Sequence, residues 1–102
     1  MNRITEKQLD KLCQYLNELT NSPLEPYSRD ENGQCKANIG NYHISHAYGG
    51  VCLHRMVNDG GGVNTPLISY HAPKRELYNA MQAFIRGLDA VRYNDVNLKK
   101  AA

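Results

Sequence analysis

Apolar residues recur at helical spacing over residues 4–20. The recurring positions, three or four residues apart, are Leu9, Leu12, Cys13, Leu16 and Leu19. This spacing predicts a helix with one apolar stripe. Thr5 and Gln8 fit a capping box, and Ile4 stands where a hydrophobic staple needs an apolar side chain. The sequence Asn21-Ser22-Pro23 then ends the helix.

Residues 24–41 are rich in turn-forming residues. Within them, Asp30-Glu31-Asn32-Gly33 favours a tight turn, because Asn and Gly tolerate positive φ. The pattern admits two interpretations, a small hairpin that pairs residues 27–29 with residues 34–36, or a loop.

Residues 42–57 predict a hairpin, because Gly49-Gly50 separates two runs of β-forming residues. With a turn there, Tyr48 faces Val51 and Tyr42 faces Val57. The mostly apolar face, expected to meet the helices, carries Tyr42, Ile44, His46, Tyr48, Val51, Leu53, Arg55 and Val57. The other face, expected to be wetter, carries His43, Ser45, Ala47, Cys52, His54 and Met56. A bulge would exchange the two faces.

A second turn over residues 58–62 and another strand follow. The strand spans roughly Val63 to Tyr70, and Pro66 places it at a sheet edge or breaks its start. A second helix is predicted over residues 73–91, where Pro73 suits the first turn. Its apolar face consists of Leu77, Met81, Phe84, Ile85 and Leu88. Gly87 weakens or ends its last turn, and residues 92–102 form a polar, frayed tail.

These elements predict an α+β fold in one domain over residues 1–91. An N-terminal helix precedes a three-stranded antiparallel sheet, with the small hairpin as an optional addition, and a C-terminal helix follows. Both helices pack on one face of the sheet, which buries every apolar stripe found.

Composition, charge and cysteine content limit the class of protein and the cellular compartment. The chain has 102 residues, a net charge of +2 and a mean hydropathy of −0.62. We expect no membrane span, no secretory signal and no disordered chain. The three cysteines form no CxxC pair and are a poor disulfide framework, which favours a reducing compartment and hence the cytoplasm.

Three residues of the wetter sheet face raise the question of a metal site. Cys52 and His54 share this face, and His43 lies diagonally across from His54, whereas His46 is on the opposite face. Such ligands suit zinc or nickel, but the spacing is not that of a known metal motif. We therefore expect ordinary solvated side chains, with no metal and no cofactor. Cys52 with His54 also resembles a nucleophile with its base, but no orienting acid accompanies the pair, so no catalytic residue is assigned.

Cations near the start of the second helix suggest an anion site. Lys74 and Arg75 oppose the helix dipole, and free helix N–H groups beside cations attract phosphate or carboxylate. Arg55, Arg86 and the Lys99-Lys100 pair extend this basic set. The glycine run at residues 60–62 is no phosphate loop, since a strand follows it and not a helix.

The order helix, three strands, helix resembles the double-stranded RNA-binding domain. That resemblance implies that basic residues at the start of the last helix meet phosphates. Lys74 and Arg75 stand at that place, but the family's lysine-rich motif does not continue in PKRELYNAMQAF. A net charge of +2 is also low for a dedicated nucleic-acid binder.

The segments GNYHISHAYGGVCLHRM, GGGV and PKRELYNAMQAFIRGL resemble a group of small bacteriophage and mobile-element proteins of no settled function. The resemblance spans about Tyr15 to Leu88. It implies a bacterial host cytoplasm and an accessory role, and it carries over no functional residue. We expect a non-enzymatic protein that binds a protein partner, a second copy of itself included, with nucleic-acid binding as the alternative. The expected interface residues are His43, Ser45, Cys52, His54 and Met56, or the glycine loop.

Overall fold

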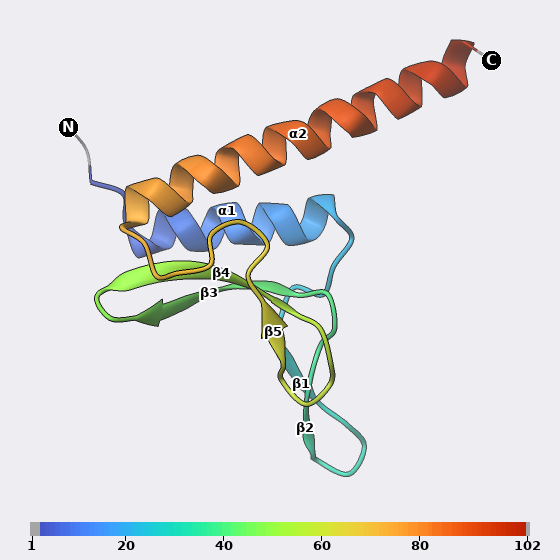
Figure 1. Cartoon of the computed structure of the whole chain (residues 1–102). Coiled ribbons are helices and arrows are strands. Elements are labelled where there is room, and N and C mark those ends of the chain that lie inside the picture. Colours follow the sequence, from blue (N-terminus) through green and yellow to red (C-terminus); the bar gives the residue numbers. More distant parts are fainter. Residues whose placement is uncertain (1–2, 102) are drawn as a thin grey trace.

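The computed structural model describes the backbone of residues 3–101 and the side chains of residues 3–92. Two helices lie on one face of a three-stranded antiparallel sheet of order β3-β4-β5, and both begin at the same end of the molecule (Figure 1). A two-stranded sheet, β1-β2, projects away from this body as an arm. The α+β architecture agrees with the prediction from the sequence.

Helix α1 (Glu6–Leu19) begins and ends as its sequence predicts. The Gln8 N–H donates to Thr5 Oγ1 at 3.2 Å, and the Thr5 N–H donates to Gln8 Oε1 at 2.8 Å, which completes the capping box. Thr20 caps the other end, where Asn21 takes a positive φ of 56°. The predicted stripe is the buried face, with Leu9 and Leu16 fully covered.

Strands β3 (Tyr42–Ala47) and β4 (Gly50–Met56) form the predicted hairpin with a different turn. The turn residues are Tyr48 and Gly49, with φ of 53° and 72°, so the predicted turn at Gly49-Gly50 is wrong. Tyr42 accordingly faces Arg55 instead of Val57. Because the register moves by two residues, each side chain keeps its predicted face.

Gly50 belongs to β4 for a steric reason. A Cβ at this position would lie 2.8 Å from the carbonyl carbon of His71 and 2.9 Å from the Ala72 oxygen. The backbone that follows β5 therefore packs directly against the start of β4, and only glycine leaves room for it.

Strand β5 (Val63–Asn64) is shorter than the predicted strand from Val63 to Tyr70. Val63 pairs with Met56 and Asn64 with Arg55, and the strand stops before Pro66, which has no N–H to donate to the sheet. Residues 65–72, here called the strap, return to β4. There Ala72 and Val51 exchange two backbone hydrogen bonds of 2.8 Å.

Helix α2 (Lys74–Ala101) begins one residue after Pro73, which was predicted to lie in its first turn, and it does not end near Gly87 or residue 91. A glycine costs about 1 kcal/mol of helix propensity but keeps the N–H that the helix needs, so it does not stop the helix by itself. The frayed tail expected over residues 92–102 falls almost entirely on residues whose side chains lie outside the described part.

The arm settles the two interpretations of residues 24–41 in favour of a hairpin. Strand β1 (Tyr27–Arg29) pairs with β2 (Cys35–Ala37), which begins one residue later than predicted. At its tip, Asp30 Oδ1 accepts from the N–H groups of Asn32 and Gln34, both at 2.9 Å, and Gly33 takes a φ of 78°.

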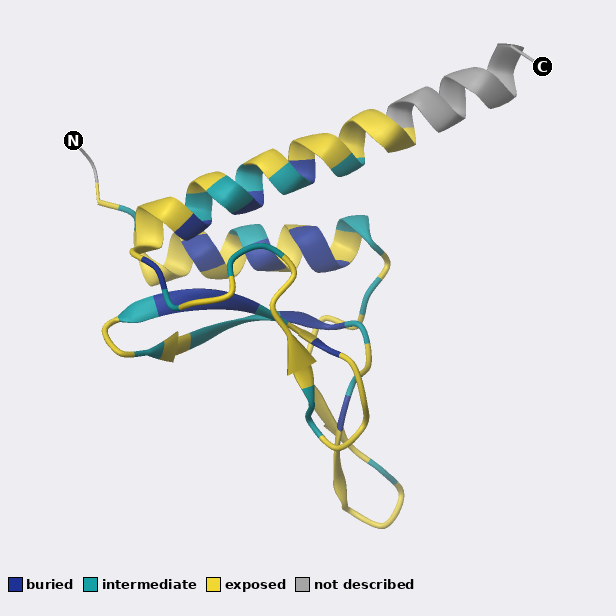
Figure 2. Cartoon of the chain, viewed as in Figure 1, coloured by how far each residue is buried: buried dark blue, intermediate teal, exposed yellow. Residues whose placement is uncertain are grey.

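The core lies between the helices and the sheet face that they cover. It consists of Leu9, Cys13, Leu16, Tyr42, Val51, Leu53, Leu77, Met81 and Ile85. Figure 2 shows this buried layer as a band between α1, α2 and β4, while most of the arm is exposed. The radius of gyration is 15.5 Å, against about 13 Å for a compact domain of this length. The molecule is thus a small packed body with a projecting arm.

Candidate functional site

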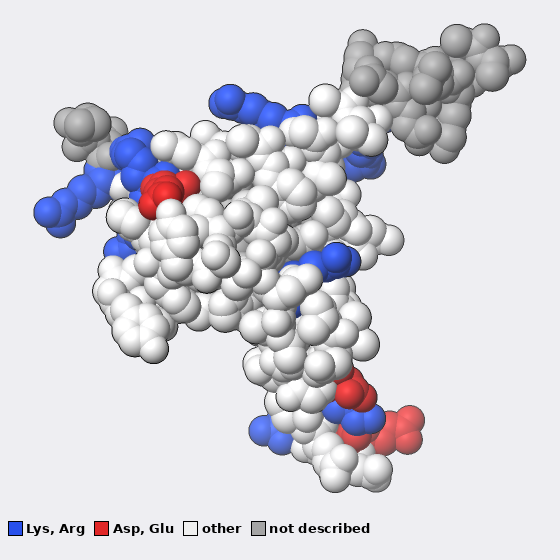
Figure 3. All heavy atoms as spheres, in the orientation of Figure 1, with Lys and Arg blue, Asp and Glu red and all other residues white. Residues whose placement is uncertain are grey.

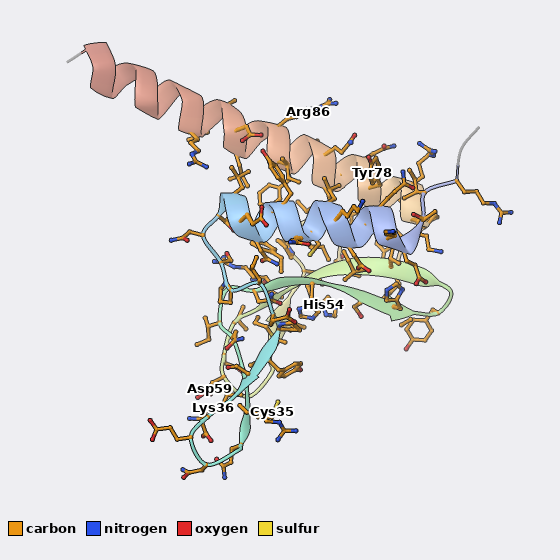
Figure 4. All side chains as sticks on the ribbon, turned by 180° about the vertical axis from the view of Figure 1, so that it is seen from behind. Cys35, Lys36, His54, Asp59, Tyr78 and Arg86 are labelled. Atoms are coloured by element: carbon orange, nitrogen blue, oxygen red, sulfur yellow. The ribbon has the colours of Figure 1, made fainter. Side chains whose placement is uncertain are left out.

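The sheet face turned away from the helices carries a row of three histidines, here called the histidine row (His43, His54 and His71). His43 and His54 are direct cross-strand partners on β3 and β4, and His71 comes from the strap. Figure 4 shows His54 on the side of the sheet opposite α1 and α2. Three rings from three separate segments therefore meet on one partly exposed surface.

The rings contact one another edge to face. The His43 and His54 centroids are 5.6 Å apart, and the His54 and His71 centroids are 6.1 Å apart. The exposed Tyr48 ring extends the series at the hairpin tip, 6.0 Å from His71. His54 is thus the central member, with a histidine on either side.

Hydrogen bonds orient the two outer histidines. His43 Nδ1 lies 3.2 Å from Asn41 Oδ1, while the Asn41 amide nitrogen donates to the Pro23 carbonyl at 2.8 Å. Because Asn41 Oδ1 can only accept, His43 carries its proton on Nδ1 and leaves Nε2 bare when neutral. His71 Nε2 lies 3.1 Å from Ser45 Oγ, which holds the strap to β3 as well as to β4.

Burial and mutual repulsion favour the neutral forms of His43 and His54. Burial is the larger cause that lowers the pKa of His43, and the neighbouring His54 lowers it further. The pKa of His54 is likewise lowered by burial and then by His71. Removing an imidazolium from water, or placing it beside another, disfavours the charged form.

Two of the predicted interface residues are not on the surface. Cys52 and Met56 are both 1% exposed, so neither is available to a partner, although their strand positions are as predicted. The strap covers Cys52, whose thiol donates to the Ile68 carbonyl at 3.2 Å. The wetter face therefore presents His43, Ser45 and His54, all partly buried, and the sequence pattern gave no sign of the strap.

The cysteine does not complete a metal or catalytic site with the histidines. Burial raises the pKa of the Cys52 thiol, which therefore stays protonated and poorly nucleophilic. Among the side chains of residues 3–92, no three His, Cys, Asp or Glu groups are placed to hold a metal ion. The proposed set of His43, Cys52 and His54 is not brought together as ligands.

The predicted anion-binding cations do not converge. Lys74 lies at the start of α2, in a hollow shared with Glu6 and His46, where His46 Nδ1 is 3.9 Å from Glu6 Oε1. Arg75 is the next residue of α2. Arg55 lies five residues along β4 from Gly50, roughly 17 Å at the usual rise of a strand, with its guanidinium 5.4 Å from the Tyr42 ring centre. Figure 3 shows Lys and Arg in several separate places on the face it displays.

The glycine loop is not an open anion cradle either. The N–H groups of Gly60 and Gly62 donate to Asn58 Oδ1 at 3.0 and 2.8 Å. The Asn58 side chain thus occupies the donors that a phosphate would need. The loop is therefore a folded turn. Of the interface predicted at this loop, only the exposed surface of the turn is left as a candidate.

His71 is the residue that the sequence analysis missed. It stands just beyond the predicted third strand, and only the pairing of Ala72 with Val51 brings it to the histidine row. No helix within the described part of the chain is long and apolar enough to cross a membrane. Comparison of the chain with protein-family models, with curated proteins and with solved structures finds no match.

Proposed function

We propose that this chain is a non-enzymatic accessory module of the bacteriophage type that binds a protein partner in the cytoplasm of a bacterial host. The observation that carries the proposal is a group of apolar side chains that stay exposed where the arm joins the body. Burying them against a partner would remove apolar surface from water, which favours association.

Exposed apolar side chains indicate where such a partner binds. Three of them, Leu24, Ile39 and Val57, are 54, 61 and 46% exposed. Their segments meet where the arm joins the body: the Gly40 N–H donates to the Met56 carbonyl at 2.8 Å, and a Cβ at Gly40 would lie 3.8 Å from Pro23. We call these three residues the arm-base patch. Apolar surface concentrated in this way is typical of interaction sites.

The free thiols support a location in the cytoplasm. Cys13, Cys35 and Cys52 are all free, and they are all the cysteines of the chain. Free thiols, one of them exposed, are usual in a reducing compartment and uncommon in secreted proteins.

The test is a binding comparison between matched variants. Tagged wild-type protein is used to isolate a partner from host cells, and the purified pair is then measured by calorimetry. Ile39→Glu, which charges the arm-base patch, should weaken binding at least tenfold. Val91→Glu, which charges an equally exposed apolar residue on α2, should leave the affinity within twofold. Unchanged affinity in Ile39→Glu would refute this surface, and a dimer in light scattering would identify a second copy as the partner.

One observation favours nucleic acid as a second candidate. The starts of both helices and the β3–β4 turn lie at the same end of the molecule (Figure 1). There Lys74 shares a hollow with Ala47 and Gly49, the residues on either side of the exposed Tyr48. Positive helix ends, a cation and an aromatic ring suit phosphates and bases. Mobility shifts with duplex and single-stranded DNA and RNA should then weaken with salt and in Lys74→Ala/Arg75→Ala. Absence of a shift at low salt would exclude it.

A further inference from the structure

The strap is attached to the rest of the body by few contacts. It carries no helix or strand of its own between β5 and α2. Five hydrogen bonds hold it: the two between the backbones of Ala72 and Val51, and one each from the Cys52 thiol to the Ile68 carbonyl, between Ser45 and His71, and from the Tyr70 hydroxyl to Glu76. Leu67 and Ile68 are only partly buried against the core. A segment held by so few contacts opens at a lower free energy than the core does.

A titratable pair lies across the junction between the strap and the sheet. His71 is on the strap and His54 is on β4, with ring centres 6.1 Å apart. In the described part of the chain, no hydrogen bond or ion pair joins either ring to a carboxylate. Two imidazolium charges at this separation would repel each other without a compensating anion.

The other titratable groups around the row act on different members. Asp10 and Glu25 line the hollow beside His43, away from the junction of His54 and His71. Tyr48 packs on His71 as a neutral ring, and the neighbouring Tyr70 donates to Glu76 at 2.6 Å. His46, near Glu6, belongs to the opposite sheet face. The repulsion between His54 and His71 is therefore not relieved by a neighbour.

We propose that His54 and His71 form an acid-sensitive latch, in which the charge that His54 gains on protonation releases the strap from β4. The direction of the pH dependence follows from the linkage between proton binding and opening of the strap. The pKa of His54 is lowered from 6.5, so the unfolded or opened state binds protons more readily than the closed one. The stabilising contribution is complete above pH 6.5 and is lost as the pH falls from there through the lower pKa of the closed state. This inference concerns the fold and does not depend on the identity of any partner.

Hydrogen exchange tests the latch directly. The protection factor of the Ala72 amide, corrected for the intrinsic rate at each pH, is measured by NMR at pH 7.5 and pH 5.0. In the wild type, we expect protection at pH 5.0 to fall at least tenfold relative to the Cys13 amide of α1. In His54→Gln, this fall should disappear. His46→Gln, a histidine on the opposite face, should retain it.

Several results would overturn the proposal. They are an unchanged protection factor of Ala72 in the wild type, an equal loss at Ala72 and Cys13, or a wild-type response in His54→Gln. The equal loss would mean that acid unfolds the whole domain. If His54→Gln does not fold, judged by far-ultraviolet circular dichroism, His71→Gln provides the same test from the strap side.

Discussion

The backbone of Tyr48 is strained, and its almost fully exposed side chain contributes little stabilisation. It holds a left-handed conformation with φ of 53°, and its side chain is 99% exposed. The left-handed conformation costs about 1 kcal/mol or more for a residue other than Gly, Asn or Asp. Asn-Gly is the preferred sequence for this turn. We expect Tyr48→Asn to raise the free energy of unfolding by about 0.5–1 kcal/mol, measured by urea titration. A loss of stability would show that the ring contact with His71 outweighs the strain.

The two glycines that follow should respond differently to alanine. Gly49 needs a positive φ of 72° but has open space around it, so Gly49→Ala should cost about 1 kcal/mol. At Gly50 a Cβ meets backbone atoms of His71 and Ala72 below 3.0 Å. Gly50→Ala should therefore cost more, about 1–3 kcal/mol, and should lower the exchange protection of Ala72. Equal costs in urea titrations would contradict this assignment of the turn.

This glycine pair also shows what local sequence could not decide. The turn rules allow a turn at Tyr48-Gly49 as well as at Gly49-Gly50. The atoms that leave no room for a side chain at residue 50 belong to the strap, which is distant in the sequence. The faces of the hairpin were nevertheless predictable, because alternation survives a shift of two residues. His71 was not predictable, since its place depends on the same long-range pairing of Ala72 with Val51.

At the scale of the elements, α1 is joined to β3 by a buried amide. Asn17 is 2% exposed, and its side chain donates to the Tyr42 carbonyl at 2.9 Å and accepts from the Tyr42 N–H at 2.8 Å. We expect Asn17→Ala to lower the free energy of unfolding by roughly 1–3 kcal/mol, because it leaves the buried Tyr42 N–H unpaired and the Cys13 thiol as the remaining donor to the Tyr42 carbonyl. Gln14→Ala, on the exposed side of the same helix, should change it by less than about 0.5 kcal/mol in the same denaturation experiment. Similar values for both variants would show that the amide does not join the two elements.

Element boundaries followed the sequence where the signal was local. The capping box of α1 is complete in Thr5 and Gln8, so its start was predictable. Two other boundaries differ from the prediction: β5 ends before Pro66, which the predicted strand included, and α2 continues through Gly87, which keeps the N–H that the helix needs. The candidate surface was predicted in part for the same reason: alternation identified His43 and His54, but not the strap that buries Cys52.

At the scale of the whole molecule, the arm lies outside the core and is joined to the body by backbone hydrogen bonds, such as that from the Ala37 N–H to the Asp59 carbonyl at 3.0 Å. None of the residues in the core cluster or packed against it lies between Thr20 and Asn41. Most residues of the arm are nevertheless exposed, and Leu24 and Ile39 of the arm-base patch flank it in the sequence. Fold and surface should therefore be separable by changing the arm alone.

Shortening the arm tip tests this separation. Ser28 and Lys36 face each other across β1 and β2, so Asn-Gly can join them directly in place of residues 29–35. We expect the melting temperature to stay within about 4 °C of the wild type, because no core residue is removed. Light scattering should give the same oligomeric state. Affinity for a partner bound at the arm-base patch should change less than in Ile39→Glu, since the tip lies beyond Leu24 and Ile39. A shortened arm that unfolds the body would show instead that the two sheets form one cooperative unit, and that the arm serves the fold rather than a partner.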